Sequence, residues 1–160
     1  MKIVKETLGL ALFRTATQLE DTGYATDLVS SFKIERLAVR VRNYNAKKYA
    51  GEITMRCGRT TTPVTELQKI CNGSATHFFY GIMNGANDSL CWWVLIDLDC
   101  FREIIKNKPE LLNSFRVITN RDGQSCFMVI PLKLISESVV HSSRYLENIM
   151  KGYVLEAACP

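Results

Sequence analysis

The clearest pattern in the chain is a strict alternation of apolar and basic residues over positions 36–42. Leu37, Val39 and Val41 are apolar, and arginines occupy most of the positions of opposite parity. Successive side chains of a β-strand point to opposite faces, so this pattern predicts a strand with one apolar and one basic face. The basic face would carry Arg36, Arg40 and Arg42, together with Ala38.

A second alternating stretch, residues 52–57, follows a loop that contains Lys47 and Lys48. One of its faces would consist of Ile53, Met55 and Cys57, and the other of Glu52, Thr54 and Arg56. Paired with the first strand, this stretch would extend the basic surface and add one carboxylate to it.

The remaining hydrophobic pattern predicts an α+β fold with a single mixed β-sheet flanked by helices. Asn-Gly and Asp-Gly turns mark two hairpins, and Gly73 is expected to end a short helix that follows Thr65. Asp99 is the expected N-cap of a later helix. The predicted elements are a helix over about 3–20, strands over 25–31, 36–42 and 52–57, a helix over 66–71, a hairpin of 77–83 and 90–96, a helix over 100–106, a hairpin of 115–119 and 125–130, and a final helix over about 143–151.

Length and composition indicate one domain over residues 1–160, since 160 residues with 47% hydrophobic content suffice for a proper core. No apolar run approaches the roughly 18 residues that span a bilayer. The first six residues also lack the apolar core of a signal peptide. We therefore expect a soluble, cytoplasmic protein without a membrane partner.

The net charge of +4 is unevenly distributed along the chain. Eight basic residues and only two acidic ones lie between Lys33 and Arg59. Such clustering is typical of proteins that bind a phosphate-bearing partner, above all nucleic acid. The alternative is a solvated basic face that binds nothing in particular. The candidate nucleic-acid-binding residues are Arg36, Arg40, Arg42, Arg56, Lys47 and Lys48.

Over roughly residues 3–83 the chain resembles the PD-(D/E)XK nuclease-like superfamily. The resemblance lies in the order of a helix, a strand with Asp27, a strand with paired charges, a third strand, a helix and a strand. It implies a restriction-endonuclease-like core (α-β-β-β-α-β), here followed by a C-terminal hairpin and helix. It also implies a Mg²⁺ ion held by the acid of the first strand and by an acid of the next strand, with a lysine two residues later to activate water. Asp27 matches the first acid, whereas Arg40-Val41-Arg42 stands where Glu-x-Lys is expected.

A metal site at Asp27 therefore needs a second carboxylate from elsewhere, because Mg²⁺ prefers several hard oxygen ligands. Glu52 and Glu66 are the two candidates, and we prefer Glu66, which opens a helix with Lys69 on about the same face. The expected catalytic site is then Asp27 and Glu66 as metal ligands, with Arg42 or Lys69 as the cation. The alternative is a structural network, in which these acids neutralise the arginines and Glu66 supports its helix N-terminus.

Two functions follow from these observations. The first is a nuclease-like protein that binds nucleic acid through the basic strand face, with Mg²⁺-dependent cleavage weak or lost; Mg²⁺ is expected only if the protein cleaves. The second is favoured by Arg40, which stands where metal catalysis would need a carboxylate. It also draws on a resemblance to small phage and prophage proteins, which lies in short sequence matches such as Phe79-Tyr-Gly81 and Trp93–Leu98. It is a phage-encoded inhibitor that binds a host defence protein through the basic face or through whichever of Trp92 and Trp93 is exposed. A homodimer is open under both interpretations.

Overall fold

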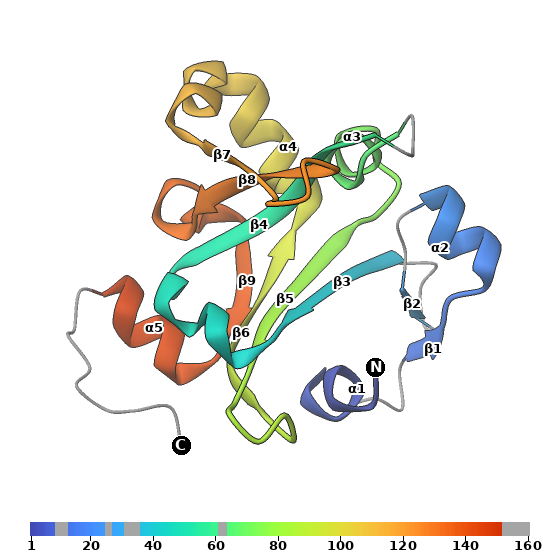
Figure 1. The fold of residues 1–160 in the computed structure, drawn as a ribbon, viewed down its shortest axis with the longest axis vertical. Coiled ribbons are helices and arrows are strands. Elements are labelled where there is room, and N and C mark those ends of the chain that lie inside the picture. The colour runs from blue at the N-terminus through green and yellow to red at the C-terminus, as the bar shows by residue number, and fades with distance from the viewer. Residues whose placement is uncertain (9–12, 25–26, 31–35, 61–63, 152–160) are drawn as a thin grey trace.

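The computed structural model describes residues 1–8, 13–24, 27–30, 36–60 and 64–151. These residues form an α+β fold with two β-sheets, which Figure 1 shows together with the helices around them. The larger sheet has six strands in the order β1-β2-β3-β5-β6-β9, and the smaller has three in the order β4-β8-β7. The expectation of an α+β chain is confirmed, but that of a single sheet is wrong.

The elements are bounded as follows. The first half contains α1 (Lys2–Leu8), β1 (Phe13–Thr15), α2 (Gln18–Tyr24), β2 (Leu28–Ser30), β3 (Arg36–Arg42), the 3-10 helix η2 (Tyr44–Tyr49), β4 (Glu52–Arg59), α3 (Glu66–Cys71) and β5 (His77–Met83). The second half contains β6 (Leu90–Asp97), α4 (Leu98–Asn107), η3 (Pro109–Ser114), β7 (Arg116–Thr119), β8 (Ser125–Pro131), η4 (Leu132–Leu134), η5 (Ser136–Ser138), β9 (Val139–Ser142) and α5 (Arg144–Met150).

The larger sheet is mixed. β3 pairs with β2 in antiparallel and with β5 in parallel orientation, and β5 forms the predicted antiparallel hairpin with β6. The chain leaves β3, forms β4 and α3, and returns as β5 on the other edge of β3. Because β2 and β5 occupy both edges of β3, that strand has no edge left for β4.

β4 therefore pairs with β8 instead of β3, so the pairing considered from the sequence does not form. Ile53 of β4 lies opposite Ile130 of β8, and both are fully buried. The register shifts between Arg56 and Gly58, where a Cβ atom on Gly58 would lie 2.5 Å from Cys126 Sγ. A side chain at position 58 would therefore displace the Cys126 thiol from its present position.

Both faces of the larger sheet are covered. Leu37 and Phe79 pack on one face with Val4 of α1, while the other face belongs to the main core. Trp92 is fully buried in the main core, and Trp93 stacks on Phe79 in the second cluster with 5.7 Å between ring centroids. The tryptophan pair therefore packs on two faces of one sheet, and neither ring is an exposed anchor.

The N-terminal segment departs from the predicted helix over 3–20. α1 ends at Leu8, β1 pairs with β2, and α2 starts at Gln18. The start of α2 is a reciprocal cap: Glu20 Oε2 accepts from Thr17 N at 2.8 Å, and Glu20 N donates to Thr17 Oγ1 at 3.3 Å. This capping box separates the two helices that the apolar spacing alone had joined.

The other caps follow the sequence more closely. Thr65 caps α3 in a capping box with Gln68, and Gly73 adopts φ +75° after the helix, as expected. The cap of α4 is Asp97 and not Asp99, because the Asp97 carboxylate accepts the N–H groups of Asp99 and Cys100. Within the residues that the structure describes, we find no helix with the length and apolar character to cross a membrane.

Candidate functional site

Three arginines from two different sheets converge on one aromatic ring. Phe127 of β8 has the guanidinium carbons of Arg40, Arg42 and Arg56 at 5.2, 6.0 and 5.5 Å from its ring centroid. These are cation–π distances. We call these four residues the arginine cluster.

The alternation of β3 and the register of β4 with β8 explain this convergence. Arg40 and Arg42 are two residues apart and so point to the same side of β3, which belongs to the larger sheet. Arg56 lies directly opposite Phe127 in the smaller sheet. The sequence predicted the three arginines as one basic surface but missed Phe127, because no local pattern tells which strand lies beside β4.

The three arginines of the cluster differ in whether an acidic side chain neutralises them. Arg40 forms an ion pair with Glu66, and the two side chains are only 15% and 17% exposed. Arg42 donates from Nη1 to Thr54 Oγ1 at 3.1 Å. Among the described residues, no ion pair includes Arg42 or Arg56. Burial, and then the neighbouring Arg40, lower the pKa of Arg56, so this site disfavours its own positive charge.

Two donors of the cluster lack acceptors. The Nε atoms of Arg40 and Arg56 are buried and find no hydrogen-bond partner among the described residues. A buried donor without an acceptor costs roughly 1–3 kcal/mol, and more when the group is charged. These Nε atoms are closed to solvent, so an anion would pair with the two guanidinium groups from the pocket that Arg40 and Arg56 both line.

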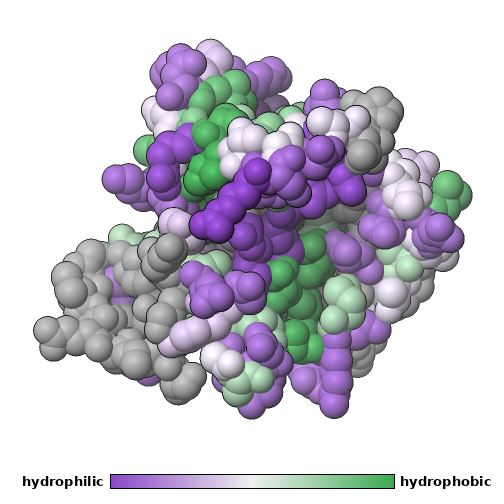
Figure 2. Space-filling view, viewed as in Figure 1, coloured by the Kyte–Doolittle hydropathy of each residue, from purple (hydrophilic) through white to green (hydrophobic). Residues whose placement is uncertain are grey.

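The two predicted metal ligands, Asp27 and Glu66, line one pocket of about 230 Å³. The structure thus brings together the acids that the sequence had paired. Its lining is mostly charged and consists of Asp21, Asp27, Val39, Arg40, Arg56, Arg59, Val64, Thr65, Glu66 and Lys69. In the view of Figure 2, hydrophilic side chains gather across the middle of the molecule, next to a hydrophobic patch.

Both carboxylates already accept hydrogen bonds from the protein. Asp27 Oδ2 accepts from Val39 N at 2.5 Å. Glu66 Oε2 accepts from the Arg40 guanidinium and from Arg56 N, the latter at 2.8 Å. Burial raises the pKa of Asp27 to about 6; the Val39 N–H opposes this rise, and the charges of Asp21 and Glu66 add to it.

This donor set fits a guanidinium better than Mg²⁺. Mg²⁺ needs ionised oxygen ligands in octahedral arrangement, whereas Arg40 already neutralises Glu66, and Asp27 Oδ2 already accepts from Val39 N. The two residues expected to supply the catalytic cation do not face the paired acids freely. Arg42 lines a different pocket, and Lys69 donates a hydrogen bond to the carbonyl oxygen of Thr22. We therefore derive no metal-dependent step from this pocket.

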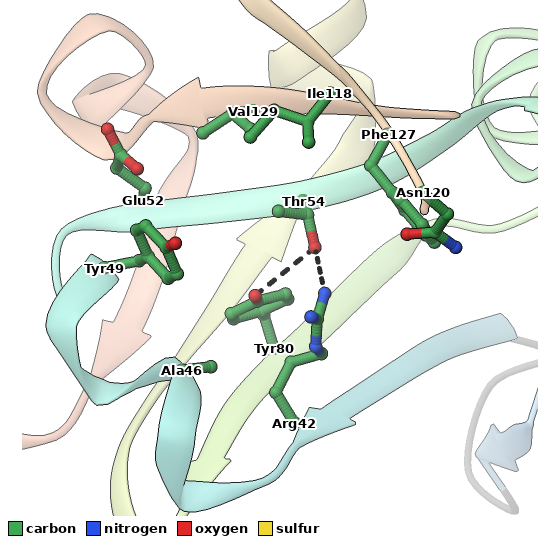
Figure 3. Close-up of a pocket in the computed structure, with 10 residues that line it drawn as sticks. All are labelled: Arg42, Ala46, Tyr49, Glu52, Thr54, Tyr80, Ile118, Asn120, Phe127 and Val129. Atoms are coloured by element: carbon green, nitrogen blue, oxygen red, sulfur yellow. Dashed lines mark hydrogen bonds between the residues drawn. The ribbon is translucent and has the colours of Figure 1, made fainter. Parts of the chain in front are cut away.

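Arg42 lines a neighbouring pocket of about 150 Å³, which Figure 3 shows in close-up. Arg42 Nη1 donates to Thr54 Oγ1, and Thr54 Oγ1 lies 3.3 Å from the hydroxyl of Tyr80. This chain of hydrogen bonds joins β3, β4 and β5, as the dashed lines in Figure 3 indicate. The pocket is lined by Arg42, Ala46, Tyr49, Glu52, Thr54, Tyr80, Ile118, Asn120, Phe127 and Val129.

The remaining predicted residues lie outside the arginine cluster. Arg36 donates from Nη2 to Gly73 O at 2.9 Å, and its guanidinium carbon lies 5.4 Å from the centroid of the Tyr24 ring. Glu52, the rival second acid, accepts two hydrogen bonds of 2.8 Å from Arg116. The backbone of Lys47 and Lys48 lies in η2, while their side chains fall outside the described part of the structure.

Comparisons of the chain with models of protein families, with curated proteins and with solved structures found no match. The functional argument therefore rests on the geometry of these residues.

Proposed function

We propose that the protein binds nucleic acid through the arginine cluster and the adjoining charged pocket, with metal-dependent cleavage weak or lost. The convergence of Arg40, Arg42 and Arg56 on Phe127 carries this proposal, because among the described residues only Arg40 of these three forms an ion pair. A backbone phosphate offers several acceptor oxygens and one negative charge. It would offset the burial and the repulsion from Arg40 that together lower the pKa of Arg56.

The surroundings of the cluster support an extended polyanion over a single small anion. Arg59 and Lys69 line the same pocket as Arg40 and Arg56, and Arg42 lines the neighbouring pocket together with Phe127. Several cations along one path can contact successive phosphates, which is the usual source of sequence-independent affinity.

A nuclease-like ancestry of the core is part of the proposal. It is supported by the adjacency of β2, β3 and β5 and by the return of the chain through α3 to the free edge of β3. The departure of β4 into a second sheet differs from the core that the resemblance implies. Binding is favoured over cleavage because Arg40 contacts the acid that would have to hold the metal ion.

An electrophoretic mobility shift assay tests the proposal, with single- and double-stranded DNA and RNA at low and at moderate salt. We expect retardation at low salt that weakens steeply as salt is added. The double variant Arg42→Gln/Arg56→Gln should bind much more weakly. Arg144→Gln is the matched control, since Arg144 is an exposed arginine at the start of α5. The proposal fails if pure protein retards none of the four nucleic acids at low salt.

A second candidate function, binding to a protein partner such as a host defence protein, is favoured by one other feature. Val117 and Ile118 of β7 are 57% and 44% exposed, and β7 is an edge strand of the smaller sheet. Exposed apolar edge strands can pair with a strand of another chain. A nuclease-treated pull-down that compares the wild type with Val117→Lys tests this function: a stoichiometric partner should be retained by the wild type and lost by the variant. Sedimentation of the pure protein would reveal a homodimer.

A further inference from the structure

The pocket of Figure 3 adjoins the arginine cluster directly. Arg42 and Phe127 belong to both, so a ligand in the pocket would contact two members of the cluster. A pocket that shares its wall with a phosphate-binding group is suited to the part of a nucleotide next to the phosphate.

The size of the pocket limits what it can hold. Its volume of about 150 Å³ is that of a cavity that binds one benzene-sized molecule. Pockets for drug-sized ligands start at roughly 300 Å³. One planar ring system fits the space, whereas a complete nucleotide or a folded peptide segment exceeds it.

The walls combine aromatic rings with polar groups. Tyr49, Tyr80 and Phe127 contribute aromatic surface. Asn120 donates from Nδ2 to Ser125 Oγ at 2.8 Å, which leaves its Oδ1 as an acceptor toward the pocket that it lines. Glu52 adds little free negative charge, because Arg116 binds both of its carboxylate oxygens. Aromatic faces together with a few hydrogen-bonding groups are the usual surroundings of an unstacked nucleobase.

We propose that this pocket receives one unstacked base of a single-stranded nucleic acid, while the arginine cluster holds the adjoining phosphate. The inference deepens the proposed function and rests on it. It restricts the ligand to single strands, because a base inside a duplex is stacked on both sides and cannot enter a pocket without being flipped out.

Fluorescence anisotropy with three labelled probes separates this inference from the proposed function. The probes are an oligothymidylate of about 12 nucleotides, a length within the range that such sites cover, its duplex, and an abasic oligonucleotide of the same length. The abasic probe keeps the phosphates and lacks the bases. We expect the single strand to bind about fivefold or more tightly than the abasic probe, as stacking of one base provides.

Tyr49→Ala and Tyr24→Ala form a matched pair of variants, because both tyrosines are 45% exposed and only Tyr49 lines the pocket. Tyr49→Ala should lose the preference for the single strand and bind the abasic probe like the wild type. Tyr24→Ala should retain the preference. Asn120→Ala is a second pocket variant at an exposed position, and it should reduce the preference in the same direction.

Four results would overturn the inference. If the wild type binds the abasic probe or the duplex as tightly as the single strand, or if the two tyrosine variants behave alike, the base pocket is refuted while the proposed function stands. If none of the three probes binds at low salt, the proposed function fails and the base pocket fails with it.

Discussion

Arg40 of β3 donates a hydrogen bond to the carboxylate of Glu66, the first residue of α3. The same carboxylate oxygen accepts the backbone N–H of Arg56 on β4. Glu66 therefore connects the larger sheet, the smaller sheet and the N-terminus of α3 through one side chain. In the nuclease-like pattern an acid is expected at position 40; here that position carries the cation, and the acid lies on the helix.

Breaking this ion pair should destabilise the protein substantially. Both side chains are largely buried, so Glu66→Gln or Arg40→Ala should each lower the free energy of unfolding by about 3 kcal/mol. The double variant Arg40→Ala/Glu66→Gln should cost less than the sum of the single changes, because it leaves no unpaired buried charge. Urea unfolding of the wild type, the two single variants and the double variant measures the coupling.

Asp99→Asn is the control, because the Asp99 side chain is 73% exposed in its pair with Arg102. This pair should contribute about 1 kcal/mol or less to the free energy of unfolding. Strictly additive losses at Arg40 and Glu66 would contradict this account.

The stability of the protein should depend on the protonation of Asp27. Its pKa is raised to about 6 in the folded state from 3.8, so the folded state binds the proton more tightly than the unfolded state. Ionised Asp27 then costs stability above pH 6, and this cost disappears as the pH falls from 6 towards 3.8. Each pKa unit corresponds to about 1.4 kcal/mol, which we discount to a total of about 2 kcal/mol because the residue is only half-buried.

The variant Asp27→Asn isolates this effect, because its amide oxygen can still accept from Val39 N. We expect the variant to be more stable than the wild type at about pH 7.5 and equal to it at about pH 4. Denaturant unfolding of both proteins at the two pH values provides the measurement. A variant that is less stable than the wild type at pH 7.5 would show that ionised Asp27 makes a favourable interaction instead.

Millimolar Mg²⁺ should leave the protein unchanged. Arg40 neutralises Glu66, and the Val39 N–H occupies one oxygen of Asp27, so the two acids offer little to a divalent cation. We expect the same unfolding temperature with Mg²⁺ or Mn²⁺ as with EDTA in differential scanning calorimetry. A metal-dependent increase that Asp27→Asn abolishes would instead support the metal site expected from the sequence.

The arginines should differ in their contribution to nucleic-acid binding. Arg56→Gln should reduce the slope of log affinity against log salt by about 0.7 for a single strand, as expected for one lost phosphate contact. Arg36→Gln should change the slope much less, because Arg36 binds Gly73 O and lies outside the arginine cluster. Affinities measured at four or more salt concentrations test this difference. Equal slopes for the two variants would mean that the whole basic face of β3 contributes evenly.

The sequence by itself determined the local elements whose signals lie within a few residues. Alternation placed β3 at 36–42, the residues from Thr65 to Gly73 delimited α3, and Asp-Gly at 122–123 indicated the β7–β8 hairpin. The pairing of Asp27 with Glu66 in one pocket was also anticipated. These features depend on backbone preferences, caps and turn residues, which act between near neighbours in the chain.

Only the tertiary structure decided where the polar side chains of β3 and β4 meet. Because β2 and β5 occupy both edges of β3, β4 pairs with β8, and this brings Phe127 between arginines of two sheets. Alternation states which residues share a face, but it carries no information about the strand or helix that will cover that face. This long-range packing produces the contact of Arg40 with Glu66, which lie 26 positions apart in the chain. It also produces the pocket beside Phe127. Burial of Arg40 favours pairing its charge with an acid, and that acid comes from a distant helix.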